Sequence, residues 1–200
     1  MEIINICRHC RCLFALSFVL CLFAFSIPSE AAELYETVKI DRGQLHIITT
    51  DQKEILPPKR SYKLGDEILN QVGFMDAVIS DDKTTVGWLA LYPNCCTSYP
   101  IPLELIIFNN GKIMRVFIGT GLPIWKWKFE NKGTQVAFEQ ETVHGSGGIH
   151  YELREIKTGL LIDSLDGDPH PKSPKWLRDF NQKRKKMANK GNTSDRQARR

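Results

Sequence analysis

The stretch from residue 122 to residue 162 constrains the fold of this 200-residue chain more than any other. Trp125, Trp127 and Phe129 alternate with other residues, which is the side-chain period of a half-buried β-strand. Three further short apolar runs follow, and turn or loop signals containing Gly, Asn or Ser separate them. Four strands joined in this way predict a four-stranded antiparallel meander, which is the shape of one propeller blade.

The same pattern occurs a second time in the chain, about fifty residues earlier. Residues 78–88 correspond to residues 128–138, because both contain a short polar turn followed by an apolar run of strand length. The expected strands of this first copy lie at residues 73–79, 85–91, 102–108 and 112–118. Five side chains occupy positions of the two copies that are expected to face the core, so we expect them to be buried: Trp88, Trp127, Val136, Phe138 and Leu153.

Both copies resemble the repeat of TolB-like (WD40-like, WD40-related) β-propellers, in which a short turn with Asp, Asn or Gly precedes a strand of the Val-Ala-Phe type. Asn131-Lys132-Gly133 with Val136-Ala137-Phe138 carries the resemblance in the second copy. Ser80-Asp81-Asp82 with Val86-Gly87-Trp88 carries it in the first. The resemblance implies blade-like sheets over about residues 73–164. However, a propeller needs at least about four blades to close, and this chain has room for about two.

The predicted fold class is therefore mainly β, with two consecutive four-stranded antiparallel meanders, an N-terminal hairpin and a short C-terminal α-helix. Strands are expected at residues 35–40, 45–50 and 54–56, whereas residues 62–71 read as a loop. Ser173 and Pro174 are typical of a helix start, and Trp176, Leu177 and Phe180 follow on one helix face.

Two meanders that do not close a ring leave sheet edges that must be protected. Face-to-face packing of the two sheets and self-association of two or three chains are both open. We expect a third solution, in which the N-terminal strands and the C-terminal helix cover the edges.

The first 32 residues predict a secretory signal peptide. Arg8 and Arg11 precede an uncharged apolar run at residues 12–27, and small residues suitable for cleavage follow. An uncleaved anchor is the alternative. The chain then divides into a signal peptide at residues 1–32, a β-rich domain at residues 33–171 and a basic helix with a disordered tail at residues 172–200. An exported protein, periplasmic or secreted, is expected.

The net charge of +4 hides an uneven distribution of charge. Residues 172–200 carry eleven Lys or Arg and two Asp, whereas residues 33–171 carry fourteen basic and nineteen acidic residues. The tail run Lys183, Arg184, Lys185 and Lys186 can contact an anionic surface, although it can also serve only for solubility. Nucleic acid is not expected as a partner, because no aromatic residues for base stacking interleave with these charges.

Three loops are expected to emerge at one end of the two meanders, at residues 92–102, 119–123 and 140–148. Loops on a rigid sheet are common places for binding. The candidate binding residues on this loop face are Cys95, Cys96, Tyr99, Glu141, His144 and His150. For the adjacent Cys95 and Cys96 three states are open in an oxidising compartment: a strained disulfide between neighbours, intermolecular bonds, or two buried thiols.

The function expected from these features is an exported, non-enzymatic binding or interaction module with a protein partner in the cell envelope. No catalytic residue and no cofactor are assigned. The alternative is a metal-dependent hydrolase that uses Glu141, His144 and His150, because imidazole and carboxylate groups suit zinc.

Overall fold

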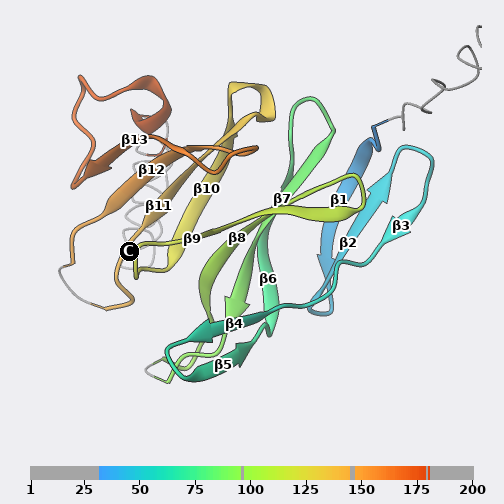
Figure 1. Cartoon of the computed structure of the whole chain (residues 1–200), viewed down its shortest axis with the longest axis horizontal. Helices are drawn as coiled ribbons and strands as arrows, with labels where there is room; N and C mark the ends of the chain where they lie inside the picture. The colour runs from blue at the N-terminus through green and yellow to red at the C-terminus, as the bar shows by residue number, and fades with distance from the viewer. Residues whose placement is uncertain (1–31, 96, 145–146, 179, 181–200) are drawn as a thin grey trace, which may run out of the picture. The chain divides into compact units, whose positions relative to one another are not determined.

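The computed structural model describes residues 32–95, 97–144, 147–178 and 180, and the predicted signal peptide and most of the basic tail lie outside this part. Two antiparallel four-stranded meanders dominate the described chain, as the sequence predicted (Figure 1). The first consists of β6 (Gly73–Ile79), β7 (Thr85–Tyr92), β8 (Ile101–Asn109) and β9 (Lys112–Ile118). The second consists of β10 (Ile124–Glu130), β11 (Gln135–Gln140), β12 (His150–Glu155) and β13 (Leu161–Asp166).

The N-terminal segment forms a three-stranded sheet whose strands lie where the sequence predicted them. Its strands are β1 (Tyr35–Asp41), β2 (Gln44–Thr49) and the short β3 (Glu54–Ile55), in the order β1-β2-β3. Leu45 and Ile47 of β2 are fully buried and pack against one face of the first meander. Residues of this sheet therefore complete the core on the side of β6, β7 and β8.

The segment predicted as a loop at residues 62–71 is instead a β-hairpin. It contains β4 (Ser61–Leu64) and β5 (Glu67–Asn70), and Tyr62 lies opposite Leu69 across the two strands. Both side chains pack against the buried cluster of the first meander. The hairpin is therefore stabilised by two side chains that pack on an apolar surface formed by residues distant in the sequence. A local sequence pattern does not reveal such a contact.

The first meander is buried on both faces. In β7, Val86, Trp88 and Ala90 belong to the cluster shared with the N-terminal sheet, whereas Leu89 belongs to the cluster shared with the second meander. Leu105 of β8 also belongs to this second cluster. Because successive strand residues point to opposite faces, a strand buried on both faces has an almost continuous apolar sequence.

A tryptophan and a glycine form a close contact between the two meanders. A β-bulge between Met75 and Val78 places Asp76 at φ 50°, and the Asp76 carbonyl accepts a 3.0 Å hydrogen bond from Trp127 Nε1. The Trp127 ring lies over Gly87, where a methyl group would be 2.3 Å from ring atom Cη2. Gly87 therefore provides the space that this ring occupies.

The C-terminal helix packs on the far face of the second meander. Residues 175–178 and residue 180 are helical, and Trp176, Leu177 and Phe180 form one buried cluster with Ala137, Tyr151 and Leu153. Trp176 Nε1 donates a 3.0 Å hydrogen bond to Asp163 Oδ2. The helix begins at residue 175, and Ser173 Oγ accepts from the His170 amide in the turn before it rather than from a helix amide. Within the described ranges, no helix is long and apolar enough to cross a bilayer.

The five side chains predicted to be buried are all buried, with Trp127 and Leu153 the most accessible of them at 7%. The N-terminal sheet and the helix, which we expected over the sheet edges, cover sheet faces instead. The two meanders also pack face to face through Trp127, Phe117 and Phe138. The apolar area available on these broad faces explains the difference, since an edge offers mainly polar backbone groups.

Two buried tyrosines, Tyr35 and Tyr92, should make the free energy of unfolding decrease at alkaline pH. Burial raises the pKa of Tyr35 to about 12, and burial together with the Glu104 carboxylate also raises the pKa of Tyr92. An unfolded tyrosine ionises near pH 10. Their contribution to stability is therefore complete below about pH 10 and is lost as the pH rises towards the folded-state values.

Urea unfolding between pH 8 and pH 12 should show a midpoint that falls steeply above about pH 10. The substitution Tyr35→Phe removes one of the two ionisations, so the fall should be shallower in that variant. An identical fall in both proteins would contradict the role of Tyr35.

Candidate functional site

The first predicted loop carries Cys95 and Tyr99 between β7 and β8. Both are exposed, and 47% of the Tyr99 surface is accessible. Cys96 lies outside the described residues, so a disulfide between the neighbours and intermolecular bonds stay predictions. The alternative of two buried thiols is wrong for Cys95, which is exposed.

The other two predicted loops meet through main-chain contacts. The Glu141 amide donates to the Pro123 carbonyl at 3.3 Å, and the Glu141 carbonyl accepts a 3.0 Å hydrogen bond from Trp125 Nε1. His144, in the same loop, is exposed. The structure therefore joins the loop after β9 to the loop after β11, as expected for one loop face, but Glu141 contributes to this contact through its backbone.

A buried glutamine holds the β9–β10 loop against the second meander. Gln140 is fully buried, and its Oε1 accepts hydrogen bonds from the Thr120 amide at 2.7 Å and from Thr120 Oγ1 at 3.3 Å. A side chain at Gly119 would collide with Gln140 Oε1 and with the Leu122 carbonyl. Gln140 and Gly119 therefore fix the entry of the chain into β10.

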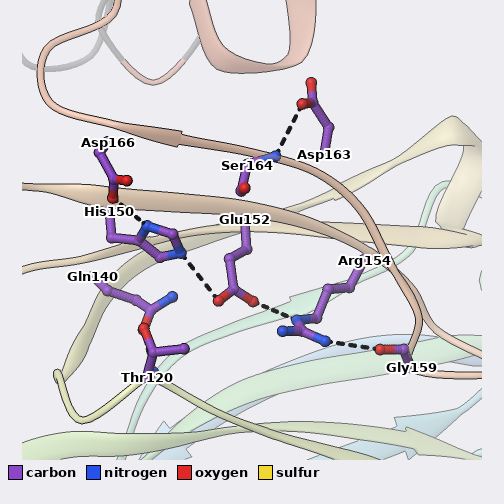
Figure 2. Close-up of polar contacts among 9 residues, drawn as sticks. All are labelled: Thr120, Gln140, His150, Glu152, Arg154, Gly159, Asp163, Ser164 and Asp166. Atoms are coloured by element: carbon purple, nitrogen blue, oxygen red, sulfur yellow. Dashed lines mark hydrogen bonds and ion pairs between the residues drawn. The ribbon is translucent and has the colours of Figure 1, made fainter.

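His150 is the first residue of β12 rather than a loop residue, and it lies between two carboxylates (Figure 2). Its Nδ1 is 2.6 Å from Asp166 Oδ1, and its Nε2 is 3.2 Å from Glu152 Oε1. A neutral imidazole has one donor and one acceptor nitrogen, whereas a protonated ring can donate to both carboxylates. The ring can bind a metal only if one of these contacts breaks.

The row of polar side chains continues along β12. Arg154 Nε donates to Glu152 Oε2, and Arg154 Nη1 donates to the Gly159 carbonyl at 3.0 Å (Figure 2). Only 2% of the Glu152 side chain is exposed. His150, Glu152 and Arg154 are alternate strand residues and share a face, whereas Tyr151 and Leu153 point to the helix side. The row therefore connects the loop end of β12 with its turn end.

Arg115 of β9 reaches the same turn from the other meander. Its Nε donates to the Ile156 carbonyl at 3.1 Å, and its Nη2 donates to the Lys157 carbonyl. Gly159 has φ +78° and lies close enough that an added methyl group would be 3.5 Å from Arg115 Nη1. Main-chain oxygens of the β12–β13 turn thus hold both guanidinium groups in place.

Between these arginines lies an open groove of about 310 Å³. Its lining consists of Arg115, Val116, Phe117 and Ile118 from β9 with Arg154, Thr158 and Gly159 from the second meander. The volume is at the lower end of the range for ligand pockets. Two fixed guanidinium groups in a mostly polar lining suit a ligand that carries a carboxylate or a similar planar anion.

The groove was not predicted from the sequence, and its two arginines were not among the candidate residues. The alternation of His150, Glu152 and Arg154 could have indicated a polar row on one strand face, but no local signal pairs Arg115 with a turn 41 residues away. Across the described part of the chain, no three His, Cys, Asp or Glu side chains are grouped so that they could hold a metal ion.

Comparisons with known proteins give no relative from which a role could be transferred. No family model matches the chain, and no curated protein matches it significantly.

Proposed function

We propose that this protein is an exported, non-enzymatic binding module of the cell envelope whose partner-binding site is the groove between β9 and the β12–β13 turn. The observation that carries the proposal is the pair of immobilised guanidinium groups of Arg115 and Arg154. A binding site gains affinity when its charged groups are fixed before the ligand arrives, because less side-chain freedom is lost on binding.

Exposed apolar side chains beside the groove support a protein as the partner. Met114 and Ile118 of β9 are 38% and 50% exposed, and Leu160, which directly follows the lining residue Gly159, is 65% exposed. Arginine together with accessible apolar surface is typical of protein interfaces. The loop-face residues and the run from Lys183 to Lys186 remain additional proposed contacts, the latter to an anionic surface.

The second candidate, a metal-dependent hydrolase, has less support. It needs the His150 ring as a ligand beside Glu141 and His144, but two carboxylates engage both ring nitrogens. Glu141 takes part in the loop contacts through its backbone amide and carbonyl. A metal titration of the purified full chain separates the two candidates.

Site-specific photocrosslinking tests the binding function. The full chain is produced in its native cells with the photoreactive residue benzoylphenylalanine in place of Ile118, which lines the groove and is 50% exposed. We expect a discrete crosslinked product with an envelope protein. The matched control places the same residue at Ile68 of β5, which is apolar and 69% exposed but lies on a different sheet.

The control position should give no product of the same size. Equal crosslinking at both positions, or none at Ile118, would reject the groove as the partner-binding site.

A further inference from the structure

We propose that the groove receives an extended acidic segment of the partner, which pairs with the edge strand β9 and places its carboxylates against Arg115 and Arg154. This inference rests on the proposed binding function and names the chemistry of the partner. It combines three observations: an open strand edge, a groove that follows this edge, and fixed positive charge beside it.

One edge of β9 has no partner strand among the described residues. β9 is the last strand of the first meander, and among the described strands β8 alone pairs with it. The ladder between them is irregular near Met114, where the register shifts, and is regular from Arg115 to Ile118. An unpaired edge with a regular backbone can accept a further strand through main-chain hydrogen bonds.

The groove follows the regular part of this edge. Arg115, Val116, Phe117 and Ile118 all line it, although consecutive strand residues point to opposite faces of the sheet. A hollow lined by four consecutive residues must therefore run along the strand itself rather than over one of its faces. An extended peptide has the matching shape.

The positive charge of the two arginines favours an acidic segment as the ligand. Main-chain carbonyls accept the hydrogen bonds of Arg115 but leave its positive charge uncompensated, and no described carboxylate forms an ion pair with it. Glu152 compensates the charge of Arg154 from the buried side, where only 2% of the carboxylate side chain is accessible. The groove thus offers one net positive charge and guanidinium donors to a carboxylate.

The same charges argue against a second copy of this chain as the added strand. The charged residues of β9 are Lys112 and Arg115, and both are basic. Pairing two β9 strands would bring like charges together or leave both without a partner, and like charges on neighbouring strands are destabilising. A strand with Asp or Glu at alternate positions has no such conflict.

Binding of short peptides to the full chain tests this proposal. The probe is a six-residue peptide of alternating valine and glutamate, and its charge-reversed control alternates valine and lysine. We expect weak but measurable binding of the glutamate peptide by calorimetry, and at least about tenfold weaker binding of the lysine peptide, the loss expected when a charge-assisted hydrogen bond is removed.

Hydrogen exchange on the unaltered protein reports strand addition directly. The glutamate peptide should slow exchange at alternate amides from Arg115 to Ile118 and leave β13, the edge strand of the other meander, unchanged. A glutamate peptide with methylated backbone nitrogens should bind at least about tenfold more weakly, because it lacks main-chain donors.

The substitution Arg115→Gln should weaken the glutamate peptide at least about tenfold, whereas Lys39→Gln, an exposed position on β1, should not. If Arg115→Gln fails to fold, the hydrogen-exchange result on the unaltered protein still decides. Equal binding of both peptides, equal binding of the methylated peptide, or full competition by inorganic phosphate at the same concentration would each overturn strand addition by an acidic segment. Peptide-induced dimers in light scattering would overturn it in favour of pairing between copies.

The two experiments together distinguish a failure of the proposed binding site from a failure of the proposed acidic ligand. A crosslink at Ile118 together with no preference for the glutamate peptide would retain the binding site and reject its acidic ligand. Absence of the crosslink together with peptide-induced protection of β9 would retain the ligand chemistry and reject an envelope partner.

Discussion

Replacing Trp127 by alanine is expected to lower the free energy of unfolding by about 3–5 kcal/mol, the usual cost of removing a large aromatic side chain from a core. Trp127 is 7% exposed and belongs to the cluster that both meanders share. The substitution also leaves the Asp76 carbonyl without its 3.0 Å hydrogen bond at the bulge of β6. Urea unfolding followed by circular dichroism measures the change.

The matched control is Trp125→Ala in the same strand. Trp125 is only half-buried and donates its indole hydrogen bond to the Glu141 carbonyl in a loop. We expect a clearly smaller loss of stability there, because less apolar area is exposed by the substitution. A loss equal to that of Trp127→Ala would show that the contact with Gly87 has no special weight.

Gly87 allows a second, independent test of the same contact. In Gly87→Ala the new methyl group would lie 2.3 Å from Trp127 Cη2, so the two sheets must shift apart. Overpacking of this kind costs about 1–3 kcal/mol. The cost should largely disappear when Trp127 is already alanine, because residues in contact are not additive. Strict additivity of the two substitutions would contradict the contact.

Replacing Glu104 by alanine should destabilise the protein by about 3 kcal/mol, the lower end of the cost of breaking a buried ion pair. Glu104 of β8 is 2% exposed. Its Oε2 accepts a 2.6 Å hydrogen bond from the Tyr92 hydroxyl and a 3.0 Å bond from Arg60 Nε. Because the Arg60 side chain is 31% exposed, water can solvate part of the charge that loses its partner, so we take the lower value.

Glu54→Ala is the control for this prediction. Glu54 pairs with His46 at 2.7 Å, but 51% of its side chain is exposed. Exposed ion pairs contribute about 0–1 kcal/mol, so the unfolding midpoint should change little. Similar losses for Glu104→Ala and Glu54→Ala would mean that the contact from Arg60 to the first meander does not stabilise the fold.

Local chemistry in the sequence determined the strands of the two meanders and their order. The second-copy turn is an example: Asn131 and Lys132 have φ 48° and 54°, and Gly133 has φ 85°. Asn and Gly adopt positive φ at lower cost than other residues, so the turn could be predicted from the local sequence alone. Alternating apolar residues likewise identified the core positions, because side-chain direction in a strand follows position alone. The likeness to propeller blades and the export of the chain remain predictions.

Tertiary structure alone decided which surfaces meet. The β4–β5 hairpin is stabilised because Tyr62 and Leu69 pack against the core of the first meander. Gly87 matters because the Trp127 ring of the other sheet packs against it. The groove arises in the same way, since Arg115 binds a turn that begins 41 residues later in the chain. Contacts between residues so far apart depend on the packing of whole sheets, and no local pattern of residues contains that information.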